Sequence, residues 1–254
     1  MNMKEYRFNK IIKLIRERGY ITVPEIAKEL GISEITVRRD LRFLEGQGLI
    51  KRVRGGATLT GITSENSFFV KLEENKEAKK EIGKKALSLL KDGSIIALSG
   101  GTTIYYMVQA LDESPITDLT ILTNSITSAW AVINLRKSFK LIHSGGTTKE
   151  KSFECIGGYV IKFFQEIGKI DFYFLGANGV DLKSGITFFD MEEAEVAKTI
   201  ILKADKVVLL ADSSKFGTSA PFRVCTLEKV DYIVTDIIPD EFKNIPDWHL
   251  KFIV

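Results

Sequence analysis

Two capped helical segments separated by only three residues constrain the N-terminal part of the chain more than any other feature. The string Thr-Val-Pro-Glu at residues 22–25 has the pattern of a capping box with Thr22 as the N-cap, and Gly31 suits the end of that helix. Ser33 is the N-cap of another helix two residues later. So short a connection forces the two helices to cross steeply, as they do in a helix-turn-helix unit.

The flanking segments extend this unit into a winged helix-turn-helix domain over residues 1–57. Apolar residues at a spacing of three or four predict a first helix over residues 4–18, and the third helix is expected to run from Ser33 to about Glu45. Residues 49–56 have the pattern of a short β-hairpin, the wing, with a basic tip. The alternative is a three-helix bundle with a solvated basic face.

Charge is distributed unevenly along the chain. Residues 1–57 contain 13 Lys/Arg and 7 Asp/Glu, whereas residues 58–254 contain 23 and 26, so a net charge of +3 combines a basic head with a mildly acidic body. A basic head predicts a polyanionic partner. Arginine can donate two hydrogen bonds to a guanine edge or bind phosphate. The residues expected to contact double-stranded DNA are Thr22, Ser33, Thr36, Arg38, Arg39, Arg42, Arg52 and Arg54.

Residues 58–74 are expected to form a linker, because their first half is short, polar and without periodicity. Residues 75–254 then alternate short apolar runs with helical patterns, which predicts a Rossmann-like, mostly parallel α/β sheet with helices on both faces. The strands are expected over residues 94–98, 119–122, 140–142, 172–175, 207–210 and 232–234.

Small, polar or charged residues follow five of these strands. Ligands of such sheets bind beyond the carboxyl ends of the strands, so the five ends predict a polar pocket that accepts an anion. Residues 99–103, Ser-Gly-Gly-Thr-Thr, open a helix and could hold phosphate, although any tight turn from strand to helix can use two glycines. Lys215 is the best candidate to meet a phosphate charge. Glu192, Glu193 and Glu195 start a helix, and either one of them bonds sugar hydroxyls or their charges only favour the helix N-terminus.

Other classes of function are disfavoured. No apolar run reaches the roughly 18 residues of a membrane span, and no secretory signal is visible at Met1. Cys155 and Cys225 form no disulfide framework, which favours a cytoplasmic protein. The two histidines are too few for a typical catalytic zinc site. We therefore expect no membrane contact, metal or cofactor.

The strings Gly-Ile-Ser at 31–33, Thr-Val-Arg-Arg-Asp-Leu at 36–41 and Arg-Gly-Gly-Ala at 54–57 resemble the signature of the DeoR family of bacterial transcriptional regulators. Residues 99–103, 119–125, 192–196 and 212–217 extend the resemblance to the DeoR-type sensor domain. This implies a fold similar to ribose-5-phosphate isomerase and CoA-transferase-like domains, and a repressor of sugar-metabolism genes with a phosphorylated sugar as effector. One small head on a single half-site would give modest affinity, so we expect a homo-oligomer (dimer or tetramer). The implied effector-binding residues are Ser99, Gly100, Gly101, Thr102, Thr103, Asn124, Ser125, Gly146, Gly176, Glu193 and Lys215.

Ser99 departs from the family, whose members often have Asp at this position. A neutral hydroxyl cannot act as a carboxylate base, which argues against isomerase activity. The alternative function is a sugar-phosphate isomerase-like enzyme with an appended DNA-binding domain. It would need a base, for which Asp181, Asp190, Glu193 and Asp212 are the candidates. Isomerisation of ribose 5-phosphate separates the two hypotheses, and we expect no catalytic residues.

Overall fold

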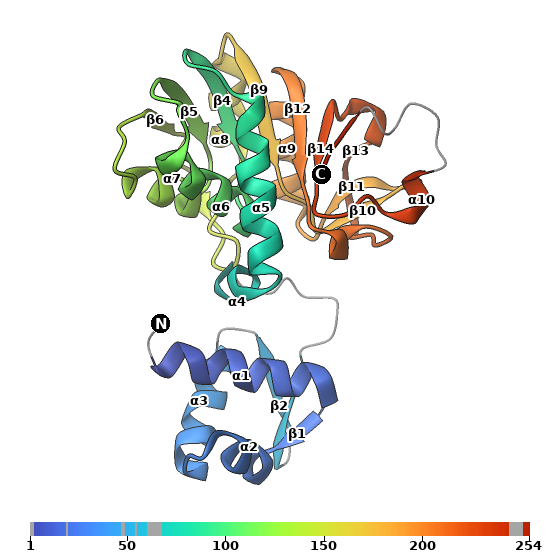
Figure 1. Ribbon diagram of the computed structural model, residues 1–254. Coiled ribbons are helices and arrows are strands. Elements are labelled where there is room, and N and C mark those ends of the chain that lie inside the picture. The colour runs from blue at the N-terminus through green and yellow to red at the C-terminus, as the bar shows by residue number, and fades with distance from the viewer. Residues whose placement is uncertain (1–2, 19, 47–48, 54, 60–67, 244–250) are drawn as a thin grey trace. The chain divides into compact units, whose positions relative to one another are not determined.

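The computed structural model of the protein describes residues 3–18, 20–46, 49–53, 55–59, 68–243 and 251–254. The chain divides into two compact units, Met1–Glu74 and Asn75–Val254 (Figure 1).

The N-terminal unit is the expected winged helix-turn-helix. Its elements are α1 (Met3–Arg18), β1 (Tyr20–Thr22), α2 (Val23–Leu30), α3 (Glu34–Gly46), β2 (Ile50–Val53), β3 (Gly56–Leu59) and α4 (Phe68–Glu73). One core joins the apolar faces of α1, α2 and α3, including Ile11, Val37 and Leu41. Gly31 ends α2 with φ +64°, a backbone conformation that glycine adopts without a steric penalty.

The wing is larger than the sequence predicts. Strand β3 pairs antiparallel with β2 on one side and with β1 on the other, so that Ala57 lies opposite both Arg52 and Ile21. Residues 58–74, expected as a linker, include Thr58 and Leu59 of β3 and the whole of α4. The strand continues past residue 57 because Ile50 and Lys51 of β2 supply paired backbone partners for these two residues.

The C-terminal unit is built on a seven-stranded parallel sheet, which confirms the expected α/β fold. The strand order in the described residues is β15-β14-β12-β9-β4-β5-β6. The strands are β4 (Ser94–Leu98), β5 (Leu119–Thr123), β6 (Lys140–His143), β9 (Ile170–Leu175), β12 (Ala204–Leu210), β14 (Tyr232–Val234) and β15 (Phe252–Ile253).

Helices cover both faces of this sheet (Figure 1). They are α5 (Lys76–Ala86), α6 (Thr102–Ala110), α7 (Ile126–Ile133), α8 (Gly158–Glu166), α9 (Met191–Ile201) and α10 (Asp240–Lys243), with single 3-10 turns η1 (Leu87–Leu89), η2 (Leu111–Glu113), η3 (Ser213–Lys215) and η4 (Leu227–Lys229). Successive strand residues point to opposite faces, so Ile96 and Leu98 pack with α5, α6 and α7, while Ala97 packs with α8 and α9.

Two further pairings were not expected from the sequence. Strands β10 (Gly179–Asp181), β11 (Gly185–Phe188) and β13 (Phe222–Cys225) form a separate antiparallel sheet. Strands β7 (Thr147–Thr148) and β8 (Cys155–Ile156) form a short hairpin, with Thr148 opposite Cys155. The residues between β7 and β8 contribute side chains to the candidate site.

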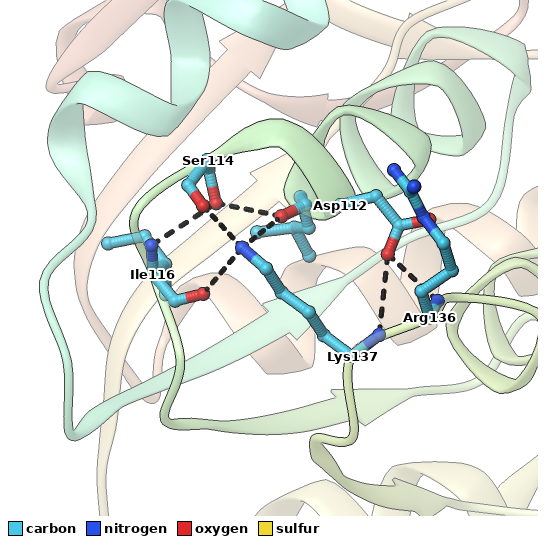
Figure 2. A network of polar contacts seen from close by, with 6 residues as sticks. Asp112, Ser114, Ile116, Arg136 and Lys137 are labelled. Atoms are coloured by element: carbon cyan, nitrogen blue, oxygen red, sulfur yellow. Dashed lines mark hydrogen bonds and ion pairs between the residues drawn. The ribbon is translucent and has the colours of Figure 1, made fainter.

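A network of polar contacts, partly buried, holds the connection between α6 and β5 (Figure 2). The ammonium group of Lys137 donates to the carbonyl oxygens of Leu111 (2.9 Å), Ile116 (3.1 Å) and Ser114. Three acceptors use all three ammonium protons. The carboxylate of Asp112 accepts hydrogen bonds from the backbone of Arg136 and Lys137, which fixes the segment before β6.

Candidate functional site

Helix α3 carries a basic, solvent-exposed face opposite its buried side. Arg39 and Arg42 are exposed, and Arg38 is exposed while it pairs with Glu34 one turn earlier at 2.8 Å. The buried side of the helix consists of Val37, Asp40, Leu41 and Leu44. A helix held in this way presents its arginines together to a ligand outside the unit.

Two of the three predicted hydroxyl residues, Thr22 and Ser33, cap helices, and the third, Thr36, contacts Ser33. Thr22 Oγ1 accepts from the backbone N–H of Glu25 (3.3 Å), and the Glu25 carboxylate accepts from the Thr22 N–H (2.8 Å), which completes the predicted capping box. Ser33 Oγ accepts from the N–H of Thr36 (3.3 Å) and lies 3.0 Å from the Thr36 hydroxyl. These contacts fix where both helices start.

Asp40 anchors α3 to α1, and the sequence analysis missed it. Its side chain is 1% exposed, and the Nε of Arg7 donates to its carboxylate at 2.8 Å. A buried carboxylate requires a partner of this kind. The signal available from the sequence was an acidic residue on the apolar side of α3, between Val37 and Leu41.

Of the two predicted wing arginines, Arg52 lies among the described residues. Arg52 on β2 pairs with Glu45 at the end of α3 at 2.6 Å, so the wing is joined to the helix. Hydrogen bonds from the backbone and side chain of Arg52 hold the pKa of Glu45 below its usual range. Arg54 lies outside the described residues.

In the C-terminal unit, the parallel sheet brings the predicted effector residues to one edge. Residues 99–103 follow β4, Asn124 and Ser125 follow β5, Gly176 follows β9, and Lys215 lies on η3 after β12. Neighbouring strands are separated by about 4.8 Å, so the ends of β4 and β12, two intervals apart, lie about 10 Å from each other.

The loop after β4 leads directly into α6. Gly101 precedes the helix with φ +102°, and no side chain caps the N-terminus. The first N–H groups of α6 therefore have no partner within the helix. The Thr102 and Thr103 side chains are buried in the first turn. This is the arrangement expected of an anion-binding turn.

Ser99 fastens the ends of two strands. Its hydroxyl donates to the carbonyl of Gly100 (3.0 Å) and accepts from the N–H of Gly176 (3.2 Å), and its own carbonyl accepts from the Ser128 hydroxyl (2.8 Å). The side chain of Tyr173 lies beside it, and burial raises the pKa of this phenol well above its usual range. Ser99 thus has a structural role in the loop.

Glu154 is a candidate site residue that the sequence analysis missed. Its side chain is 9% exposed, its carboxylate accepts from Asn124 Nδ2 (3.2 Å), and a Cβ added to Gly100 would lie 2.5 Å from its Oε1. Residue Phe153 before it has φ +59°, and Ser125 forms a β-bridge with Glu154. No local pattern in residues 149–154 marks Glu154, because the pairing that places it joins segments 29 residues apart.

Glu193 belongs to the same cluster through Ser152. The Ser152 hydroxyl donates to the Glu193 carboxylate at 2.5 Å and accepts from the Glu154 N–H at 3.3 Å. Asp190 caps α9 by accepting from the N–H of Glu193 (3.1 Å), and Lys149 pairs with Asp190 at 2.6 Å. The hairpin segment between β7 and β8 is thereby tied to the start of α9.

Lys215 lies next to a buried carboxylate, that of Asp212. The carboxylate accepts from Asn75 Nδ2 (2.9 Å) and from the N–H of Ser214 (3.1 Å). Burial alone would raise the pKa of Asp212, but the hydrogen bond from Ser214 and the charge of Lys215 outweigh it and hold the pKa below its usual range. Lys215 itself is half-buried.

Two predicted effector residues have structural contacts. Ser125 caps α7 by accepting from the N–H of Ser128 (3.2 Å). Gly146 has φ +119°, and a Cβ there would lie 2.5 Å from a methyl group of Val160 on α8. In contrast, the Oδ1 of Asn124 is buried and has no hydrogen-bond partner among the described residues. An orphaned buried acceptor is a candidate contact for a ligand that carries a donor.

The remaining reactive side chains give no sign of chemistry. Burial raises the pKa of the Cys225 thiol to about 12, and Cys155 is buried. Within the described ranges, no three His, Cys, Asp or Glu residues are grouped to hold a metal ion. None of the described helices is long and apolar enough to cross a membrane.

Comparison with known proteins identifies both units. Residues 7–63 match the family model described as the DeoR-like helix-turn-helix domain, and residues 74–237 match that of the DeoR C terminal sensor domain. Among solved structures, ribose 5-phosphate isomerase A from Methanocaldococcus jannaschii is 20% identical and has a TM-score of 0.41 over 56% of this chain and 55% of that chain.

Curated relatives span nearly the whole chain. The HTH-type transcriptional regulator GlpR of Haloferax volcanii is 34% identical over 91% of this chain and 89% of its own length. The glycerol-3-phosphate regulon repressor of Escherichia coli K12 is 30% identical over 96% of each chain, and the regulator FruR of Bacillus subtilis is 34% identical over 94% of this chain and 93% of its own length. These relatives are named as regulators, not as enzymes. The chain therefore belongs to the DeoR family of DNA-binding transcriptional regulators.

Proposed function

We propose that this regulator is a cytoplasmic, homo-oligomeric repressor of sugar-metabolism genes that releases its operator when a phosphorylated sugar or polyol binds the C-terminal unit. The phosphate would lie at the N-terminus of α6, on the loop of Gly100, Gly101, Thr102 and Thr103, and Lys215 would neutralise part of its charge. Oligomers are part of the proposal because one small DNA-binding head contacts a single half-site.

The observation that carries the proposal is the unpartnered Oδ1 of Asn124 beside the Gly100 loop. It needs a hydrogen-bond donor, and a sugar hydroxyl supplies one. Glu154 and Glu193 add carboxylate acceptors in the same cluster. Carboxylates repel a phosphate but accept from hydroxyl groups, so the cluster suits the polyol part of the ligand while α6 and Lys215 suit its phosphate. A ligand with both groups uses all of these contacts.

The test is a thermal-shift screen of the full chain against paired phosphorylated and free compounds, including glycerol 3-phosphate and the hexose phosphates. A ligand at 100 times its Kd stabilises the native state by about 2.7 kcal/mol. For a unit of this size, that raises the melting temperature by roughly 5–10 °C. We expect a shift with one phosphorylated compound and none with its unphosphorylated partner. No shift with any phosphorylated compound would refute the proposed effector class.

Two variants separate the functions of the two units. Arg39→Ala should weaken operator binding about 5- to 150-fold, the cost of losing one base or phosphate contact by arginine, and leave the thermal shift unchanged. Lys215→Ala should abolish the response of operator binding to the effector and leave binding without effector intact. Operator affinity within twofold of wild type for Arg39→Ala would reject the recognition-helix assignment. An unchanged response of Lys215→Ala would remove Lys215 from the site.

A further inference from the structure

Ile35 occupies an unusual position on helix α3. It lies in the first turn of the helix, and its side chain is 81% exposed. At 100° per residue, Ile35 lies within 60° of Arg38, Arg39 and Arg42 around the helix axis. The buried residues Val37, Leu41 and Leu44 lie on the opposite side. An apolar side chain is therefore presented at the centre of the basic face.

Two other exposed apolar side chains of this unit have packing partners. Phe43 is 46% exposed and stacks on Phe8, with ring centroids 5.0 Å apart. Tyr20 is 43% exposed and lies against the wing, since a Cβ added to Gly56 would be 2.9 Å from its ring. Ile35 is the most exposed large apolar side chain among the described residues of the N-terminal unit. It does not contribute to the core that joins the three helices.

The chemistry of the major groove identifies one apolar partner for such a side chain. N-terminal residues of a recognition helix contact base edges in this groove. Every base edge there presents hydrogen-bond donors or acceptors, and the C5-methyl group of thymine is the apolar exception. An aliphatic side chain placed on a polar edge would desolvate that edge without replacing its hydrogen bonds.

We propose that Ile35 contacts the methyl group of a thymine in each operator half-site and selects for thymine at that position. The inference rests on operator binding by α3, and it adds a sequence preference that the arginines do not supply. Arg39 and Arg42 are suited to guanine edges or phosphates, whereas Ile35 reads a group that carries no charge. Removal of the thymine methyl should therefore weaken binding only while the aliphatic side chain is present.

The experiment begins with the full-length protein and an operator selected from a randomised DNA library. Each thymine of the selected site is replaced in turn by uracil, which removes the methyl group and keeps the base pair. We expect about a fourfold loss of affinity at one thymine per half-site, the effect of one methyl group that is no longer buried. Uracil at the other thymines should change affinity less than twofold.

Two variants assign the effect to Ile35. Ile35→Ala keeps a good helix former and should bind thymine and uracil operators with affinities within 1.5-fold of each other. Leu202→Ala is the matched control, because Leu202 is 83% exposed and lies in the other unit. It should retain the full fourfold difference. Non-specific DNA binding should be the same for all three proteins.

Several outcomes would overturn the inference. One is a selected operator without a thymine in each half-site, and another is a wild-type protein that does not distinguish thymine from uracil at any position. A uracil effect that persists in Ile35→Ala would assign the methyl contact to another residue or to DNA shape. Failure of the operator binding on which the inference rests looks different, because the full-length protein would then select no sequence at all.

Discussion

Gly83 on helix α5 lies directly against the backbone of helix α6. The variant Gly83→Ala tests whether the absence of a side chain there sets the distance between the two helices. A Cβ at this position would lie 2.6 Å from the backbone nitrogen of Met107 and 2.7 Å from its Cα, both on α6. Carbon contacts need about 3.5 Å, so the two helices would have to separate by nearly 1 Å. The obstacle is backbone, which cannot rotate away as a side chain can.

The magnitude follows from two opposing effects. Overpacking of this kind costs typically up to about 3 kcal/mol, and a rigid backbone contact lies at the upper end of that range. Replacement of a helical glycine by alanine stabilises the folded state by about 1 kcal/mol. The net loss of unfolding free energy is about 2 kcal/mol, which lowers the melting temperature by roughly 4–8 °C in a unit of this size.

Tryptophan fluorescence is a suitable readout, because both tryptophans of the chain, Trp130 and Trp248, belong to the C-terminal unit. Gly158→Ala is the matched control: it also replaces a helical glycine, and a Cβ there meets nothing within 4 Å. The control should be neutral or stabilising by up to about 1 kcal/mol. A Gly83→Ala protein as stable as wild type would refute the reasoning that the α5–α6 contact is set by the absence of a side chain.

Two further predictions concern buried carboxylates. Asp40→Asn removes the charge opposite Arg7 and should destabilise the N-terminal unit by about 2 kcal/mol. This loss is smaller than the loss expected on breaking a fully buried ion pair, because Arg7 is 19% exposed. Unchanged amide hydrogen-exchange protection in α1 and α3 would contradict this prediction. Asp212→Asn should lower the stability of the C-terminal unit by about 1.5–3 kcal/mol at pH 7. Because the folded-state pKa of Asp212 is depressed, its contribution is present above the unfolded pKa of about 3.9 and disappears as the pH falls through the folded value. The melting temperatures of wild type and variant should therefore converge as the pH falls below about 3.9, and a constant difference would reject this assignment.

The features that could be predicted from the sequence are those encoded within a few residues. The capping box of Thr22 and Glu25 and the left-handed Gly31 depend only on neighbours in the chain, and the structure has both. The parallel strands were found for a related reason: a run such as residues 94–98 is apolar on both faces, which is typical of a strand covered by helices on each side. Local patterns of this kind locate the elements without information about their partners.

The features that were missed depend on contacts between distant segments. Strand β1 has three residues and becomes a strand only because β3 pairs with it 36 positions later, at Ile21 and Ala57. The sheet of β10, β11 and β13 joins Ile186 to Cys225 in the same way. Short strands have too few residues to establish a period, so their sequence does not distinguish them from turns.

The two missed carboxylates, Asp40 and Glu154, follow from the same cause. An acidic residue in a sequence is read as solvent-exposed, because an ionised carboxylate is rarely buried without a partner. The partner of Asp40 is Arg7, 33 positions away, and that of Glu154 is Asn124, 30 positions away. Neither pairing can be inferred until α1 is packed on α3 and the β7–β8 hairpin is placed beside β5. Charged residues that the fold brings into its interior are therefore the part of a site that sequence patterns identify last, and Glu154 of the candidate site is such a residue.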